Sequence, residues 1–581
     1  MNKIYFTIIV INGFLLFGCN KSLNITPNGR ITIEDVFQNE KETEAYLNTV
    51  YSDIPSYARS YGTTWTLLAG ITDDAQDASS GDQVDFCFVT PWIAGALTPG
   101  YNPIADRGNG NAMDHYSSFW DGIRNANVFL ENLDHAPFND TTRKNRFKAE
   151  ATLLRAFYYW ELVKQYGPMP IFDKPLDPNA DFSAITRPTF QDNIDFIVKD
   201  CNAAIANPNF PLRITTPGES SRFSKAVAYA IKSEATLYNA SPLWNPTNDI
   251  SKWKAAAQAS NEALDALIKD GEYGLYPDYG EYFLSQQDFT KNPRDKETIY
   301  QIMSGNPGVC SNIPSKQPSW VLGDCPTQEL VDAYDMQATG EPAILGYNDD
   351  NHLNPIINPT SGYDPNNPYV GRDPRFYATV WYNGAEYDNI NGAIHTVETY
   401  VGGADEIKGN PPYVLNTHTG YYLRKGIDPK LTTAQSKNNS WKKYRLAEIY
   451  LNLAEAENEA TGPDQIVYNA VNTIRRRANM PDLPAGLSQD EMRIRIRRER
   501  RVEMPYEEQR FWDVRRWKII NQTDKLVTGM EIIKNSDGTF SYTRFVTERR
   551  NAWQDKFLIF PIPIQDASII PDFTTHQNPG W

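Results

Sequence analysis

The sequence predicts a mainly α protein in which a scaffold of paired helices carries an irregular, loop-rich region. Two observations predict this division. In several blocks, apolar residues recur every three or four positions, the spacing of helices that bury one face. Between those blocks lie residues 57–111 and 273–440, which are rich in Gly, Pro, Asn and Asp and show little periodicity. We therefore expect the helical scaffold over about residues 30–56, 112–272 and 441–581.

Individual helices follow from their apolar stripes and stop signals. A helix is expected over residues 145–167, because its apolar residues share one face and Gly167 ends it. Ala-rich segments 224–239 and 252–269 predict two helices that approach closely. Paired helices with small residues at their crossings resemble tetratricopeptide-type hairpins. The remaining helices are expected over residues 192–206, 441–461 and 465–478.

Composition excludes several classes of function. The 581 residues carry 56 basic and 72 acidic side chains, which gives a net charge of −16 and a pI of about 5.0. This balance argues against a protein that binds nucleic acid or an anionic membrane. A mean hydropathy of −0.54 leaves no room for several membrane spans. Aromatic residues make up 12% of the chain, so some rings must be exposed, where they suit uncharged ligands.

The N-terminus has the pattern of a lipoprotein signal peptide. Lys3 precedes a largely apolar stretch, residues 4–17, which is short for a membrane span and is followed by Gly and Cys19. We expect residues 1–18 to be the signal peptide, Cys19 to be lipidated and residues 19–581 to form a single domain. The other cysteines show no metal-ligand spacing, and a disulfide within this set stays open. They are Cys87, Cys201, Cys310 and Cys325.

Several motifs resemble those of the SusD/RagB lipoproteins, a family of outer-membrane nutrient-binding proteins. Residues 445–456, Arg-Leu-Ala-Glu-Ile-Tyr-Leu-Asn-Leu-Ala-Glu-Ala, match the family signature Arg-Leu-Ala-Glu-x-Tyr-Leu-x-x-Ala-Glu-Ala. Further blocks follow the family's order along the chain, and the shared order indicates membership. These blocks are residues 149–170, 371–376, 472–478, 499–517 and 560–580.

The resemblance implies a fold and a role. Family members build four tetratricopeptide-like hairpins that carry a loop-rich ligand domain. They sit on the outer membrane through a lipid anchor, as a lid on a TonB-dependent barrel of the SusC type, and deliver oligosaccharides or, for some members, peptides to it. We therefore expect a cell-surface glycan-binding lipoprotein with that transporter as its partner, no catalysis and no cofactor. Asp-rich and Asn-rich turns also suit a structural calcium ion without specifying one.

A sugar ring needs an exposed aromatic plane flanked by hydrogen-bonding groups. Trp65 lies shortly before a pair of carboxylates, Trp92 follows a Thr-Pro turn, and Trp320 lies between two loop cysteines. Ligand-contacting aromatics of the family come from loops placed like these. An arginine in the turn Arg-Asp-Pro-Arg adds a donor, although Asp373 alone also explains that turn. The predicted ligand contacts are Trp65, Asp73, Asp74, Trp92, Trp320 and Arg372.

Charged residues of the motifs are predicted to hold the scaffold together, because Arg and carboxylate side chains on neighbouring helices can pair. The run from Arg493 to Arg501 holds six arginines, but carboxylates follow it closely, so we interpret it as a solvated or ion-paired helix. The residues predicted to pair are Arg445, Glu448, Glu455, Arg475, Glu499, Glu503, Arg510 and Asp513.

Three alternatives to glycan capture are considered. A glycosidase would need two converging carboxylates, but the adjacent Asp73 and Asp74 seldom reach one bond, and the six histidines lack metal-ligand spacing. A peptide receptor of the same family and a protein adaptor without a small ligand remain open. The sequence does not identify the glycan, its linkage or its length.

Overall fold

A computed structural model describes residues 32–55, 67–77, 89–104, 115–177, 179–284, 294–302, 323–388, 392–407, 416–430 and 440–581. Within these ranges the chain is mainly helical, as predicted. No helix in these ranges is long and apolar enough to span a bilayer. The longer helices are α3 (Glu40–Ser52), α5 (His115–Asn132), α6 (Thr141–Tyr166), α7 (Phe190–Ala206), α8 (Lys225–Ala240), α9 (Ile250–Ile268), α14 (Leu446–Thr461), α15 (Gln465–Arg477), α16 (Gln489–Glu503) and α17 (Gln509–Arg516).

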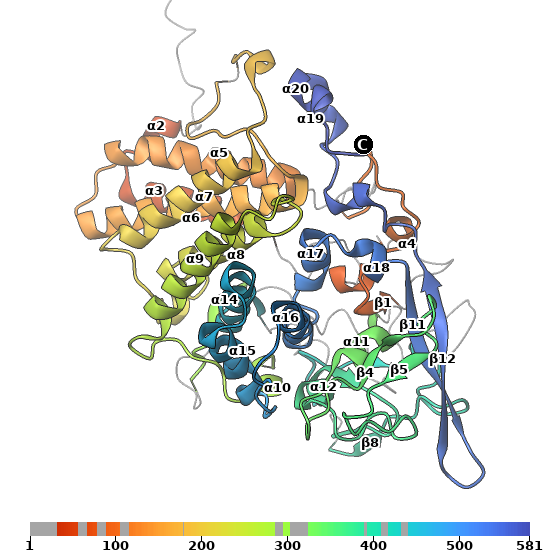
Figure 1. The fold of residues 1–581 in the computed structure, drawn as a ribbon. Coiled ribbons are helices and arrows are strands. Elements are labelled where there is room, and N and C mark those ends of the chain that lie inside the picture. Colours follow the sequence, from red (N-terminus) through yellow and green to blue (C-terminus); the bar gives the residue numbers. More distant parts are fainter. Residues whose placement is uncertain are drawn as a thin grey trace, which may run out of the picture.

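The helices stack in chain order, each against the next. α5 packs on α6, α6 on α7, α7 on α8 and α8 on α9. α14 then packs on α9, although the whole loop-rich region separates the two in the chain. Figure 1 shows α5 to α9 on one side of the molecule and the short strands on the other, with α14 to α16 between them. The scaffold therefore reaches the loop-rich region through its C-terminal helices.

Local signals explain where these helices begin and end. The Asp140 side chain accepts a hydrogen bond from the first turn of α6, and Thr189 forms a capping box with Asp192 at the start of α7. α6 ends at Gly167 and α14 at Gly462, which have positive φ values of 73° and 91° that favour glycine. The helices predicted from stripes and stop signals are confirmed to within a few residues, apart from the start of α14.

Two segments expected in the helical scaffold are strands instead. Residues 441–445 form β10 (Trp441–Arg445), which pairs antiparallel with β2 (Thr298–Ile302), and α14 begins only after it. Strand β11 (Leu526–Lys534) pairs with β12 (Phe540–Arg549) in a hairpin that extends from the body in Figure 1. The predicted helix start at residue 441 was wrong, and residues 526–549, expected within the helical scaffold, form a strand hairpin. Pairing with a distant strand decided the first segment, and alternating β-branched and aromatic residues favour the second.

Short elements build the loop-rich region. One cluster of buried apolar residues extends from Phe37 to Phe573 and joins this region to the scaffold. Its short helices are α4 (Val89–Ile93), α11 (Gln328–Ala333) and α12 (Pro374–Thr379). Its two-stranded sheets are β1 (Ala75–Asp77) with β3 (Asp324–Pro326), β4 (Ile344–Tyr347) with β5 (Pro355–Ile357), β6 (Val380–Trp381) with β9 (Tyr422–Leu423), and β7 (Glu386–Asp388) with β8 (Ile394–Thr396).

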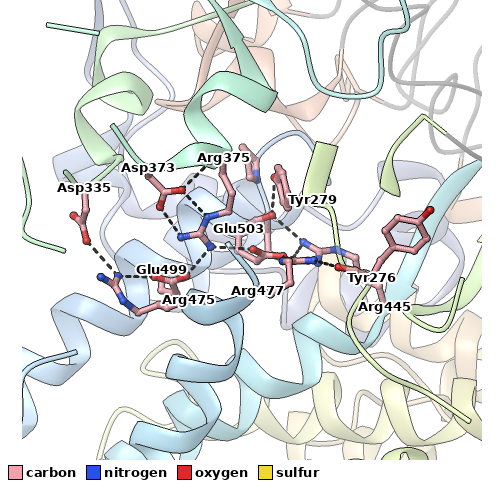
Figure 2. A network of polar contacts seen from close by, with 12 residues as sticks. Tyr276, Tyr279, Asp335, Asp373, Arg375, Arg445, Arg475, Arg477, Glu499 and Glu503 are labelled. Carbon is pink, nitrogen blue, oxygen red and sulfur yellow. Dashed lines mark hydrogen bonds and ion pairs between the residues drawn. The ribbon is translucent and has the colours of Figure 1, made fainter. Parts of the chain in front are cut away.

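A buried ionic network joins the scaffold to the loop-rich region, and Figure 2 shows its residues. Glu503 of α16 accepts from Arg445 Nη1 at 2.7 Å, from Arg375 Nη1 at 2.9 Å and from Arg477. Glu499, one turn earlier, accepts from Arg375 Nη1 at 2.6 Å. The predicted structural role of these charged residues is confirmed. Further pairs of the predicted set are Arg475 with Glu499, Arg500 and Arg516 with Asp513, and Arg516 with Glu455.

Candidate functional site

Asp73 and Asp74 follow the short 3₁₀ helix Leu68–Ile71 and are buried. Both oxygens of Asp73 accept hydrogen bonds from Arg510 at 2.8 Å, and Asp74 Oδ1 accepts from Arg501 Nε at 2.7 Å. Burial alone would raise the pKa of Asp73, but the charges of Arg501 and Arg510 outweigh it and lower the pKa to about 2. The expectation that these two carboxylates contact a ligand is corrected, because both are buried and pair with arginines of the C-terminal helices.

Trp92 lies in α4 and is 1% exposed. Its ring centroid is 5.5 Å from that of Phe511, 6.0 Å from that of Phe557 and 5.7 Å from that of Phe560. Arg515 stacks on it as well, with its Cζ 5.5 Å from the ring centroid. The expectation of a ligand platform is therefore corrected, because these side chains enclose the indole and leave no face for a sugar ring.

Arg372 is also buried, with 1% exposure. Its guanidinium donates to three backbone carbonyls, of Val331 at 2.6 Å, Tyr334 at 2.8 Å and Pro368 at 2.9 Å. The neighbouring Asp373 caps α12 by accepting from the backbone N–H of residue 375. Arg372 thus ties loop carbonyls together, which corrects its predicted ligand contact and favours the structural explanation of this turn.

Trp65 and Trp320 lie outside the described residues, but the described ends of their segments meet. The Leu67 backbone N–H donates to Asp324 Oδ2 at 2.8 Å, so the residues that follow segments 56–66 and 303–322 are neighbours. In the β1–β3 sheet Asp77 is the register partner of Asp324. Cys325 forms hydrogen bonds with the Thr417 side chain and the His418 backbone. We call Leu67, Asp77, Asp324, Cys325 and Thr417 the loop junction.

The loop junction is the point from which four undescribed segments depart. Residues 56–66, 78–88, 303–322 and 408–415 each begin or end within two residues of it. Burial, with the nearby charge of Asp77, raises the pKa of Asp324 well above its usual range. The surroundings of Asp324 in the junction therefore disfavour its negative charge.

A hollow beside α5 was not anticipated. It has a cavity volume of about 550 Å³ and lies between α5, residues 170–185 and the C-terminal helices α19 (Ile564–Ile569) and α20 (Pro571–Thr575). Rings of Trp120 and Phe172 line it together with the side chains of Asp121 and Arg124. The hollow is thus a second location, besides the loop junction, where aromatic and polar groups could contact a ligand. Sequence periodicity does not reveal this hollow, because its walls come from opposite ends of the chain.

Two features of the described residues bear on nucleophilic and metal chemistry. Cys201 and Cys325 are buried free thiols, while Cys19, Cys87 and Cys310 lie outside the described residues. Burial raises the pKa of Cys325 to about 12, so this thiol is not nucleophilic at neutral pH. In the described part of the chain, no group of three or more His, Cys, Asp or Glu side chains is placed to hold a metal ion.

Comparison with known proteins places this fold. A model of the SusD family matches residues 285–581, and a second, described as starch-binding associating with outer membrane, matches residues 38–237. The SusD-like proteins P25 and P2 of Formosa agariphila are 22% and 23% identical to the chain, over 96% and 100% of it and 95% and 99% of their own lengths.

Solved structures agree. A SusD-like protein from Bacteroides fragilis aligns with a TM-score of 0.75 and 27% identity, over 96% of this chain and 100% of that one. A laminarin-binding SusD-like protein aligns with a TM-score of 0.59 and 24% identity, over 94% of this chain and 100% of that one. The match extends over nearly the whole chain, so the helical stack and the loop-rich region belong to one shared fold.

Proposed function

The chain belongs to the SusD family, and we propose that it captures glycans at the cell surface and delivers them to a TonB-dependent transporter of the SusC type without cleaving them. The starch-binding description of the second matching family and the laminarin-binding relative support a glycan ligand. Lipidation at Cys19 would hold the protein on the outer membrane, where such a transporter lies.

We place the ligand at the loop junction. The hydrogen bond between Leu67 and Asp324 supports this proposal, because it joins the described residues that follow the segments containing Trp65 and Trp320. Chain connectivity keeps the Cα of Trp65 within about 7 Å of Leu67 and that of Trp320 within about 11 Å of Gly323. Two indoles from separate segments can then stack on one oligosaccharide.

The chemistry of this site is binding alone. Stacking and hydrogen bonds exchanged with water give modest affinities, about 4 to 8 kcal/mol, so dissociation constants should lie between micromolar and millimolar. A neutral glycan should bind with little dependence on salt. Asp73 and Asp74, the adjacent carboxylates considered for acid and base catalysis, already pair with arginines and are withdrawn from solvent.

Titration calorimetry against a panel of plant, microbial and host glycans tests the proposal. A glycan that binds the wild type and binds Trp65→Ala or Trp320→Ala at least about fivefold more weakly supports it, since stacking of one base-sized ring is worth about 1–3 kcal/mol. Trp244→Ala is the matched control, because this partly buried indole stacks on Phe190 within the scaffold. Its affinity should equal that of the wild type.

Other outcomes separate the alternatives. Loss of affinity only in Trp120→Ala would move the site to the hollow beside α5. Binding of peptides and of no glycan would indicate a peptide receptor. Co-purification of a transporter with the protein, without binding of any tested glycan or peptide, would favour an adaptor. Release of shortened glycan products would reveal an enzyme.

A further inference from the structure

A cavity on the scaffold has no role in the proposed glycan site. It has a volume of about 420 Å³ and lies where the turn between α8 and α9 meets α14 and α16. Pro242, Pro246 and Trp253 form its apolar wall. Its charged groups are Arg493, Arg497, Lys518, Glu455 and Glu459. The balance of these five groups decides what the cavity can hold.

Both carboxylates of the cavity already have partners. Glu455 accepts from Arg516 Nη2 and from the indole N–H of Trp517, each at 2.7 Å. Burial alone would raise the pKa of Glu455, but Arg516 outweighs it and lowers the pKa to about 2. Glu459 accepts from Arg493 Nη2 at 2.6 Å. The direct hydrogen bonds of both carboxylates thus go to groups other than Arg497, although both carboxylates attract Arg497 at longer range.

Two cations of the cavity lack partners. Arg497 forms no hydrogen bond or ion pair with any residue in the described part of the chain, and its Nε atom is buried without an acceptor. Its guanidinium instead lies over the Trp517 ring, with Cζ 4.6 Å from the centroid. Lys518 is exposed, and its side chain likewise has no ion pair among the described residues.

Arg497 is partly buried, and a buried guanidinium nitrogen normally recovers its lost solvation through an acceptor, which its Nε lacks. Burial lowers the pKa of Arg497, and the like charges of Arg516 and Arg493 add to this shift, while the charges of Glu455 and Glu459 oppose it. The group stays charged at neutral pH, since arginine titrates far above it. The lining carries three cations and two carboxylates, so the cavity has a net positive lining in a protein with a net charge of −16.

We propose that this cavity binds a small oxyanion, a carboxylate or a sulfate group, on Arg497, with Lys518 adding attraction. The planar guanidinium is a bidentate donor that matches either group, and its position over the Trp517 ring fixes its orientation. The apolar wall suits the ring that carries the anion. An acidic monosaccharide, whether a uronic acid or a sulfated sugar, has both features. This site does not depend on the glycan site at the loop junction.

Titration of the purified protein with sodium glucuronate, glucose 6-sulfate and glucose at low ionic strength tests the proposal. We expect millimolar binding of at least one acidic sugar and none of glucose. Arg497→Gln should weaken the affinity at least about tenfold, because it removes a charge-assisted pair of hydrogen bonds. Arg497→Lys keeps the charge but loses the bidentate geometry, so its affinity should lie between those of the wild type and Arg497→Gln. Binding of glucuronate alone assigns a carboxylate, and binding of the sulfate alone assigns a sulfate.

Arg476→Gln is the matched control, because Arg476 is an exposed arginine that already pairs with Asp482. It should bind like the wild type. Equal binding of glucose, no binding of either acidic sugar, or unchanged affinity in a folded Arg497→Gln protein would each overturn the proposal. Neutral glycans that bind at the loop junction should do so equally in Arg497→Gln, so failure here leaves the proposed function separately testable.

Discussion

Replacing Glu503 by glutamine tests whether the ionic network joins the two parts of the molecule. The Glu503 carboxylate is fully buried and accepts hydrogen bonds from Arg375, Arg445 and Arg477. Burial alone would raise its pKa, but these three guanidinium groups outweigh it and hold the pKa well below its usual range. Glutamine keeps the size of the side chain and removes the charge that the three cations share.

The magnitude follows from what each arginine retains. Breaking a buried ion pair by removing one partner costs about 3–5 kcal/mol. Arg375 keeps Asp373 at 2.7 Å and Arg445 keeps Glu507 at 2.6 Å. Arg477 keeps Glu297 at 3.1 Å. Because every cation keeps a carboxylate, we expect a loss near the lower end, about 3 kcal/mol of the free energy of unfolding.

Urea titration at neutral pH measures this loss. Asp482→Asn is the control, because it breaks the exposed pair with Arg476 and should leave the midpoint unchanged. The depressed pKa also sets the pH dependence. The stabilisation is complete above the pKa of an unfolded glutamate and disappears as the pH falls toward the folded pKa, so the variant and the wild type should converge in acid. A Glu503→Gln midpoint as close to the wild type as that of Asp482→Asn would refute the reasoning.

Two further predictions concern other buried side chains. Burial and the nearby Glu234 raise the pKa of Glu448 to about 8, so the stability of the wild type should decrease as the pH rises from 5 through 8. Glu448→Gln should flatten that decrease, which melting temperatures across the same range would measure, and equal slopes would contradict it. Trp92→Ala should cost about 3–5 kcal/mol in urea titration because it empties a core site. Its glycan affinity should remain that of the wild type, and a loss specific to binding would restore Trp92 as a ligand contact.

The helical scaffold was predictable because its signals are local. Apolar stripes, the caps at Asp140 and Thr189, and glycines at positions 167 and 462 all act within one or two turns of the helix they define. The strand β10 was missed for the opposite reason. Its pairing partner, β2, lies in a different part of the chain, and no periodicity within residues 441–445 indicates a strand.

The candidate site could be predicted only in part. Loop positions of Trp65 and Trp320 were visible in the sequence, and described residues that follow their segments, Leu67 and Asp324, share a hydrogen bond, while the ligand contact itself stays a prediction. Asp73 looked equally available, yet Arg510, 437 residues away in the chain, binds it. Arg497 shows a further limit, because its helix was expected to be solvated or ion-paired, and the sequence did not indicate which guanidinium would lack a directly bonded carboxylate.

The sequence by itself determined the family and the ends of most helices, since motifs and capping residues act over short distances along the chain. Only the tertiary structure decided which carboxylates are occupied, which indole is enclosed and which arginine is left unpaired. Those properties depend on partners brought together from distant segments, and the free energy of burying a charge or a ring depends on all of them at once.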